Sequence, residues 1–393
     1  MTPTIKLRWW CMAMAVLPFV FTSSYSTSLM TQMLVGILIC LSYQVLLSQG
    51  GMLSFGHAIF TGAGSYAVIH GLNTHLFEMG ATGWLWVIAL PLLGGLTAAA
   101  VAAMLGWIAT ARSGTPFAMI TLGLGELVWA AAWMFPDWSG GEAGLSADRT
   151  VTDPPFGMSF AQAWHLYALS AVYVLACAWA VVRFTQTPMG LMLRATRDRA
   201  VRVAFLGYNP HLIRYIAFIV SAFIAGIAGG LTALNFEFVS VDSFSLQRSG
   251  SAMLFTVVGG GALIGGSIIG GVLMVTASVV LSTFTPAWSA YVGLLFIWVV
   301  MRWPNGLSGM TPRDVLARAN GWGFATAIGI IFLIEMTYHW VTAVAAGMPA
   351  TLDILMVSVN VSQASHWSLA IAFTAVAYWL ASRGRTASSE GRS

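Results

Sequence analysis

Long apolar stretches alternate with short polar segments along most of the chain. The apolar runs fall at about 9–22, 28–47, 52–72, 83–110, 115–135, 164–182, 212–235, 252–283, 286–301, 322–347 and 366–382. A helix needs about 20 apolar residues to span a bilayer, and many of these runs approach that length. The strands of a membrane barrel would alternate apolar and polar residues instead. The pattern therefore predicts an all-α polytopic membrane protein with about 9–11 transmembrane helices.

The composition supports a chain that is surrounded mainly by lipid. Hydrophobic residues make up 58% of the sequence and charged residues only 8%, against about 25% charged residues in a soluble domain. The basic residues lie beside the apolar runs, as membrane topology requires, so the net charge of +4 does not indicate a nucleic-acid partner. No clean small-x-small cleavage site follows the first apolar run, and we expect an uncleaved first helix there.

The positions of the basic residues indicate the orientation of the chain. We take the N-terminus as cytoplasmic and count the predicted crossings along the chain. Of the 17 basic residues, 15 then lie on the cytoplasmic side, and only Arg149 and Arg248 lie on the opposite side of the membrane. This bias agrees with the positive-inside rule. Because Arg248 falls outside and Arg302 inside, residues 249–301 must contain an odd number of crossings. We expect three crossings there, with the first two short.

Glycines interrupt one apolar run in each half of the chain, at 50–65 and 259–271. Paired broken segments indicate a transport site near the bilayer midplane, because the freed backbone groups need protein or water as partners. Ser54, Gly56 and His57 are therefore candidates to contact a translocated solute. Close packing of helices at small residues and a purely structural role for His57 are the alternatives.

Two acidic residues, Glu126 and Glu335, lie inside apolar runs. Ionisable groups in a bilayer are costly and indicate a pathway or a pairing partner. Glu126 lies among glycines and is a further candidate for the translocation site. Glu335 and His339 are one helical turn apart, so we expect them to pair or to anchor their helix. They are too few for a metal site, and the cysteines, all in apolar runs, are expected to be buried thiols.

The longest polar stretch on the predicted cytoplasmic side spans residues 184–211. Thr187 and Pro188 are typical of a helix start, and the stretch from Gly207 to Pro210 is typical of a helix end. Apolar residues alternate there with a basic set made up of Arg194, Arg197, Arg199 and Arg202. The pattern predicts a short amphipathic helix at the membrane surface. Such a helix either anchors to lipid headgroups or docks into a groove of a partner protein.

Several ordered motifs then resemble one family, the LivM-type permeases of branched-chain amino-acid ABC importers. The segment TPMGLMLRATRDRAVRVAFLGYN is similar to the cytoplasmic loop of that family, at Pro188, Gly190, Arg194, Ala195, Arg197, Leu206 and Gly207. The segment GMLSFGHAIFTGAGSYA resembles a second signature, at Ser54, Gly56, His57, Ala58, Gly62, Gly64 and Tyr66. SGTPFAMITLGLGE, GGEAGL and WPNGLSGM follow in the family's order, so the resemblance covers roughly residues 28–310.

The resemblance implies a multi-pass permease in the bacterial inner membrane, with a transmembrane domain at residues 1–320. It implies that the loop 184–211 carries the helix that engages an ATPase. The residues assigned to that coupling are Arg194, Ala195, Arg197, Asp198, Leu206 and Gly207. The implied partners are ABC ATPase subunits, a second homologous permease, a periplasmic or extracellular solute-binding protein and membrane lipid. Residues 321–393 extend beyond the family's usual end, and Glu126 stands where an amide or apolar residue is expected.

The chain itself lacks the chemistry for ATP hydrolysis. A P-loop needs a lysine after a glycine-rich turn to hold the phosphates, whereas the one lysine of this sequence, Lys6, has no glycine before it. We therefore expect no cofactor in this chain, with ATP used by a partner. A secondary transporter or channel without an ATPase is the first alternative. An integral membrane enzyme is the second, but the sequence has no Gly-x-Ser-x-Gly or His-Glu-x-x-His motif and no dense acidic cluster.

Overall fold

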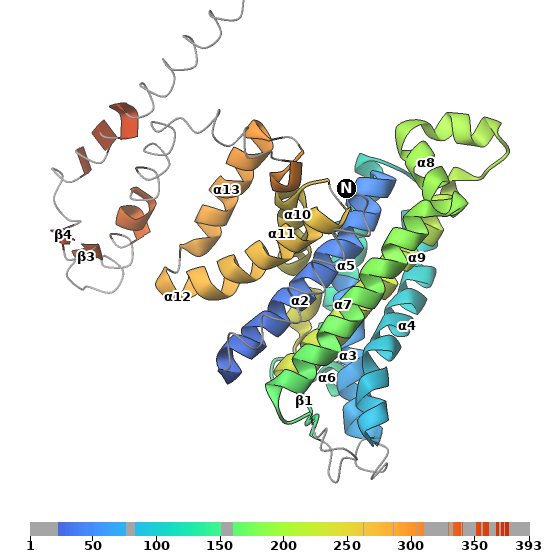
Figure 1. Cartoon of the computed structure of the whole chain (residues 1–393), viewed down its shortest axis with the longest axis horizontal. Coiled ribbons are helices and arrows are strands. Elements are labelled where there is room, and N and C mark those ends of the chain that lie inside the picture. The colour runs from blue at the N-terminus through green and yellow to red at the C-terminus, as the bar shows by residue number, and fades with distance from the viewer. Residues whose placement is uncertain are drawn as a thin grey trace, which may run out of the picture. The chain divides into compact units, whose positions relative to one another are not determined.

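The computed structural model describes residues 23–75, 83–150 and 160–309, apart from 262, 286 and 304, together with short stretches between 329 and 376. Six helical stretches in this part of the chain are long and apolar enough to cross a membrane: Ser24–Gln49, Gly83–Ala109, Thr115–Met134, Ala163–Gln186, Pro210–Phe236 and Ile264–Leu281. The all-α polytopic prediction is confirmed (Figure 1). The apolar run 9–22 and residue His339 lie outside the described residues.

The described chain divides into two compact units. The larger contains the described residues up to Thr276 and those within Pro304–Gly309, and the smaller contains those within Ala277–Trp303 and beyond Met310. The smaller unit includes α13 (Trp288–Arg302) and a two-stranded pairing of β3 (Thr351–Ile354) with β4 (Val357–Asn360). The predicted boundary between residues 1–320 and 321–393 remains a prediction.

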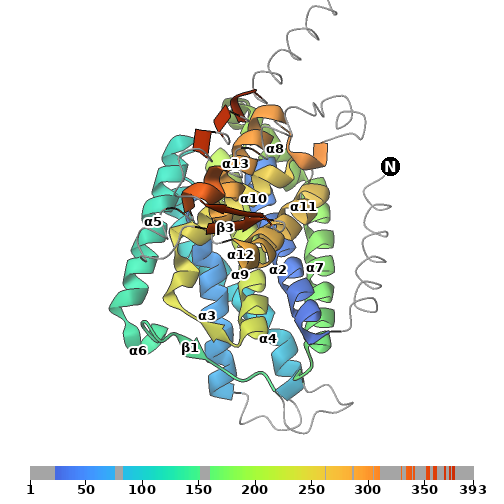
Figure 2. The ribbon, with the colours of Figure 1, turned by 90° about the vertical axis from the view of Figure 1, so that its left-hand side faces the viewer.

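The larger unit is a helical bundle arranged around α9 (Pro210–Phe236), which packs against α2 (Ser24–Gln44), α3 (Ala58–His75) and α4 (Gly83–Ala109). The helix α7 (Ala163–Gln186) packs on α2. Small residues let these helices approach closely, as is common in membranes. Both views show these helices running side by side (Figures 1 and 2).

The two ends of this bundle carry different structures. At one end lies α8 (Pro188–Phe205), and at the other lie α6 (Pro136–Ser139) and the antiparallel pair of β1 (Leu145–Ser146) with β2 (Phe238–Val239), as both views show. The C-terminal end of α4 lies at the same end as α8. There, Arg214 near the start of α9 donates a hydrogen bond of 3.3 Å to the carbonyl oxygen of Thr110, the residue after α4. Arg149 lies at the other end. This separation agrees with the predicted distribution of charge.

Three helical stretches lie between Leu246 and Arg302, the same number as the crossings that the charge count predicted, and the crossings themselves stay a prediction. The first is α10 (Leu246–Gly259), and α13 is the last. Between them α11 (Leu263–Val275) continues through a π-helical segment into α12 (Ser282–Phe284). The expectation that the first two would be short holds for α10 with its 14 residues. It is wrong for the second, because Ile264–Leu281 is long enough to span a bilayer.

Candidate translocation and coupling sites

The first glycine-broken segment joins α2 to α3. The last turn of α2 widens into a π-helical segment, η1 (Val45–Gln49), and helical structure resumes only at α3. Gly51 has φ +62°, a conformation that favours glycine. A methyl group on Gly56 would lie 2.3 Å from the backbone oxygen of Thr121 on α5 (Thr115–Met134). Gly56 therefore serves the close approach of α5, as the packing alternative predicted.

His57 is buried at the entrance to α3, with 1% of its surface exposed. Its Nε2 lies 2.8 Å from the hydroxyl of Ser42, which itself donates to the carbonyl oxygen of Ile39 at 2.7 Å. Since the Ser42 hydrogen is used there, Nε2 must be the donor in the pair. The other nitrogen, Nδ1, has no hydrogen-bond partner among the described residues. One side of the ring is thus anchored, and the other offers a buried polar atom.

Ser54 lies beside this histidine in the same segment. Its carbonyl oxygen accepts a hydrogen bond of 2.5 Å from the hydroxyl of Tyr43, whose ring packs edge-on against His57. The Ser54 hydroxyl is fully buried and has no partner among the described residues. Buried polar atoms without partners are uncommon in proteins. Ser54 and His57 each supply one at this break.

The second half of the chain contributes to the same region. The hydroxyl of Ser249 on α10 accepts a hydrogen bond of 2.8 Å from the backbone nitrogen of Ala58, the first residue of α3. This bond satisfies one of the donors that a helix start leaves free. Ser249 could not be identified from the sequence, because a serine far away in the chain carries no local signal for this contact.

Glu126 lies on α5, half-buried, and forms no hydrogen bond or ion pair with the described residues. The neighbouring Gly125 does approach the break, since a methyl group there would lie 3.4 Å from the Cα of Gly56. The structure thus brings α5 against the broken segment. It does not bond Glu126 to Ser54 or His57.

A cavity of about 470 Å³ lies between α3, α4, α5 and α6. Its lining is apolar apart from His70 and Thr97. Both polar side chains are already bonded, His70 to the carbonyl oxygen of Trp138 at 3.1 Å and Thr97 to that of Gly94 at 3.0 Å. No charged side chain lines this cavity. It therefore offers no ion-pairing group for the ammonium or carboxylate of an amino acid.

The amphipathic helix predicted near residue 188 is α8. Its start is capped by Thr187, whose hydroxyl accepts from the backbone nitrogen of Gly190 at 3.3 Å. It ends at Phe205, and Gly207 follows with φ +86°, the left-handed conformation common after a helix. Both predicted boundaries are confirmed. An extended backbone at Arg199 also interrupts α8, which the sequence pattern did not indicate.

The six residues assigned to coupling divide into two groups. Arg194 donates to the carbonyl oxygen of Thr185 at 2.8 Å, and Arg197 donates to that of Ser48, while Ala195 packs partly buried in the core. These three residues hold α8 on the bundle. Asp198 is exposed and pairs with Arg197 at 3.1 Å, whereas Leu206 and Gly207 lie at the open end of the helix.

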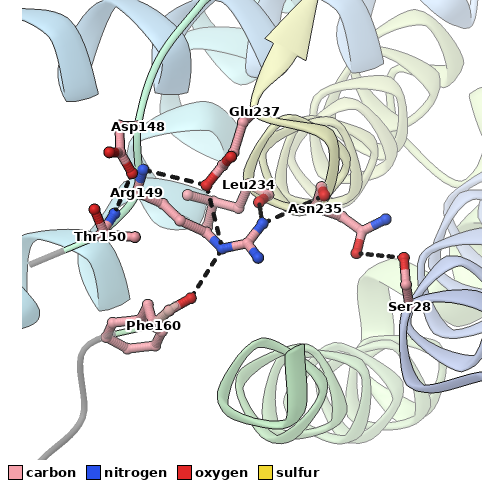
Figure 3. Close-up of polar contacts among 8 residues, drawn as sticks. All are labelled: Ser28, Asp148, Arg149, Thr150, Phe160, Leu234, Asn235 and Glu237. Atoms are coloured by element: carbon pink, nitrogen blue, oxygen red, sulfur yellow. Dashed lines mark hydrogen bonds and ion pairs between the residues drawn. The ribbon is translucent and has the colours of Figure 1, made fainter. Parts of the chain in front are cut away.

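A network of hydrogen bonds closes the opposite end of the bundle (Figure 3). The guanidinium of Arg149 donates to the carbonyl oxygens of Phe160, at 3.0 Å, and of Leu234 and Asn235 in the last turn of α9. Its Nε also lies 3.5 Å from Glu237. A cation is favourable where a helix C-terminus leaves its carbonyl groups free. From the sequence alone, Arg149 was visible only as an exception to the positive-inside rule.

Multiple apolar spans, two glycine-broken segments and a surface helix are features of a multi-pass membrane transport permease. The family model for the permease component of the branched-chain amino acid transport system matches residues 25–303, and the chain belongs to that family. No solved structure matches the chain significantly.

Relatives among characterised proteins agree with this assignment. The chain is 28% identical over 335 residues to the high-affinity branched-chain amino acid transport system permease protein LivM of Salmonella typhimurium, covering 78% of this chain and 76% of that protein. It is 27% identical over 345 residues to LivM of Escherichia coli, covering 81% and 78%. The galactofuranose transporter permease protein YtfT of Escherichia coli is 25% identical over 157 residues, covering 37% and 46%. These relatives are transport permeases, which are not enzymes.

Proposed function

We propose that this chain is a permease subunit of an ABC importer in the bacterial inner membrane. It moves a branched-chain amino acid, or a similar amino acid or small amide, with energy from a separate ATPase subunit. The solute class follows the LivM relatives, whose matches span about four fifths of the chain. ATP is used by the partner, and this chain needs no cofactor.

The exposed end of α8 is the observation that carries the proposal. Phe205 is 87% exposed, Leu206 69% and Val201 68%, although all three are large apolar residues. Exposed apolar groups gathered at one site mark interaction surfaces, and an amphipathic helix docks readily into a groove. Arg199 and Arg202 on the same short segment add positive charge beside the apolar groups. An ATPase subunit is the partner that this helix fits.

Ser54, Gly56, His57 and Glu126 are proposed to lie along the translocation route. The support is the broken backbone, where polar atoms of Ser54 and His57 have no partner among the described residues, and the ionisable side chain on the adjoining helix α5. A second permease subunit would complete the route, and a solute-binding protein would deliver solute at the end that carries β1 and β2. The segment 321–393 is proposed to be an extra C-terminal membrane extension of two helices with a cytoplasmic tail.

Partner identification tests the proposal directly. The tagged protein is purified gently in detergent from its native membrane, and the partners are identified by mass spectrometry. Stoichiometric recovery of a P-loop ATPase together with a second permease supports an importer subunit. A homogeneous protein without any ATPase refutes it and favours a secondary transporter or channel.

A substitution in α8 then tests the docking surface. Phe205→Asp should remove the ATPase from the purified complex, because it places a charge in the apolar contact. Phe236→Asp is the matched control, since Phe236 is 54% exposed and ends α9 at the other end of the bundle. Normal ATPase recovery with Phe205→Asp would show that α8 is not the docking helix.

A further inference from the structure

The π-helical segment η1 lies between α8 and the second glycine-broken segment. On one side its Ser48 contacts α8, and on the other Ser48 contacts the backbone at Gly261. Gln44, the residue just before η1, contacts the backbone at Gly260. All of these residues belong to the larger unit. Single π-helical turns are rare and occur frequently at functional sites. The contacts around η1 show what this one does.

The contact with α8 is made mainly by Arg197. Its guanidinium donates to the carbonyl oxygen of Ser48 in η1. Its aliphatic stem covers Gly51, where a methyl group would lie 2.5 Å from the Arg197 Cγ. The buried Leu193, one turn earlier in α8, lies against Gly50. A displacement of α8 therefore acts directly on the end of η1.

The contact with the second broken segment also involves Ser48. The Ser48 hydroxyl donates to the carbonyl oxygen of Gly261 at 3.1 Å, and the amide of Gln44 donates to that of Gly260. Gly260 has φ +100°, and a methyl group there would lie 2.3 Å from the oxygen of Asn305. The backbone nitrogen of Gly261 donates to that same oxygen at 3.3 Å. Gln44, Ser48 and Asn305 thus all bond to the backbone of this break.

The first broken segment begins where η1 ends. The backbone nitrogen of Met52 donates to the carbonyl oxygen of Leu46 at 3.0 Å, and the segment then continues to Ser54 and His57. Ser48 is therefore continuous with one break through the backbone and bonded to the other through its hydroxyl. Its carbonyl oxygen accepts the hydrogen bond from Arg197 of the surface helix α8.

We propose that Ser48 is a positioning residue that transmits a displacement of α8 to both glycine-broken segments. Arg197 on α8 is bonded to the carbonyl oxygen of Ser48, and the hydroxyl of Ser48 is bonded to Gly261. A displacement of α8 therefore shifts Ser48, and the shift of Ser48 displaces Gly261. The identity of the driver, an ATPase acting on α8, rests on the proposed function. The physical link between Arg197, Ser48 and Gly261 belongs to this chain alone.

Hydrogen–deuterium exchange of the purified chain, read by mass spectrometry, tests the link without any partner. Arg197→Met removes the guanidinium and keeps the stem over Gly51. It should speed exchange of the amides of Gly260 and Gly261 about fivefold, the effect of losing one net hydrogen bond. Ser48→Ala should do the same, and Ser48→Thr, which retains a hydroxyl, should restore slow exchange. Arg202→Met is the matched control on α8 and should leave these amides unchanged.

The double variant Arg197→Met with Ser48→Ala shows whether the two substitutions act through one link to Gly260 and Gly261 or loosen the structure independently. If Ser48 carries the link, adding Arg197→Met to Ser48→Ala has no further effect at Gly260 and Gly261. The proposal is overturned if the two effects multiply, or if Arg197→Met changes exchange only within α8 and η1. The thermal unfolding midpoint of each variant shows whether it is folded.

The assembled transporter provides a second readout. With its ATPase and binding protein present, Ser48→Ala should lower solute-stimulated ATP hydrolysis about fivefold and retain basal hydrolysis. Unchanged stimulation would overturn the role of Ser48 in coupling. If no ATPase copurifies, the proposed function fails, while the exchange experiment still decides whether Arg197 and Gly261 are linked.

Discussion

A methyl group on Gly64 would lie 2.2 Å from the carbonyl oxygen of Gly226, so α3 and α9 meet backbone to backbone. The helix α4 joins at the same level, because a methyl group on Gly226 would lie 2.3 Å from the oxygen of Gly94. Three helices thus cross at three glycines. Close crossings of this kind gain dispersion contacts that larger residues would prevent.

Gly226→Ala should therefore destabilise the bundle. The added methyl group meets backbone atoms of Gly94, which cannot rotate away as a flexible side chain can. We expect a loss of about 1–3 kcal/mol or more in the free energy of unfolding. The measurement is the thermal unfolding midpoint in detergent.

Gly123→Ala is the control for the same chemical change. A methyl group on Gly123 has no atom within 4 Å, and the residue lies inside α5. It should leave stability unchanged or raise it by about 0.5–1 kcal/mol, because alanine favours a helix more than glycine does. Equal losses for Gly226→Ala and Gly123→Ala would show that the crossing has no special packing requirement.

Arg149→Met should destabilise the end of the bundle that carries β1 and β2. The side chain of Arg149 is 13% exposed and binds two carbonyl oxygens in the last turn of α9. Hydrogen bonds made by a charged group contribute about 1.5–3 kcal/mol, and we expect a loss of about 2 kcal/mol. Local exchange of the amides of residues 233–239 would report it.

Glu237→Gln distinguishes the ion pair from those hydrogen bonds. Glu237 is 38% exposed and lies 3.5 Å from Arg149. Partly exposed pairs contribute about 0–1 kcal/mol, so the loss should be smaller than for Arg149→Met. A larger loss for Glu237→Gln would mean that the ion pair, and not the bonds to α9, holds this end together.

The stability of the loop that contains Asp148 and Arg149 should depend on pH. The pKa of Asp148 is lowered, mainly because its carboxylate accepts a hydrogen bond of 2.8 Å from the backbone nitrogen of Thr150. The stabilisation is therefore present above the unfolded pKa of about 3.9. It is lost as the pH falls through the lower folded value.

Asp148→Asn removes that dependence. The difference in unfolding midpoint between wild type and Asp148→Asn should shrink as the pH falls from about 6 to about 3. Glu142→Gln, which neutralises an exposed carboxylate on the other side of β1 and leaves the Thr150 hydrogen bond intact, is the control for the change of charge. A difference that grows in acid would contradict a depressed pKa for Asp148.

Glu126→Gln should reduce solute transport without lowering stability. No described residue forms a hydrogen bond or ion pair with Glu126, so the neutral amide breaks no packing interaction. We expect about a tenfold loss in transport rate, the effect of about 1.4 kcal/mol in a barrier. The assay is uptake into proteoliposomes or cells with matched protein levels. Wild-type uptake by Glu126→Gln would remove this residue from the translocation route.

The helical architecture could be predicted from the sequence because apolar run length and charge placement are local signals. The start of α8 at Thr187 and Pro188, and its end before Gly207, followed from capping chemistry at those residues. The glycines of both broken segments were also visible as interruptions in apolar runs. Each of these features depends on residues close together in the chain.

The contacts between distant segments could not be predicted in this way. Ser48 and Gly261 are 213 residues apart, and Ser249 and Ala58 are 191 residues apart. A serine hydroxyl carries no mark of the carbonyl or amide that it will bind. The breaks at 50–65 and 259–271 were therefore visible in the sequence, but the bonds from Ser48 to Gly261 and from Ala58 to Ser249 were not.

The Arg149 network also has a consequence for biosynthesis. Arg149 binds carbonyl groups that lie 85 and 86 residues later in the chain. Translation proceeds from the N-terminus, so Arg149 emerges from the ribosome well before Leu234 and Asn235. Arg149 therefore cannot make its bonds to α9 until α7, α8 and α9 have been synthesised and inserted. Formation of the hydrogen bonds between Arg149 and α9 would therefore mark the point at which α9 has packed into the bundle.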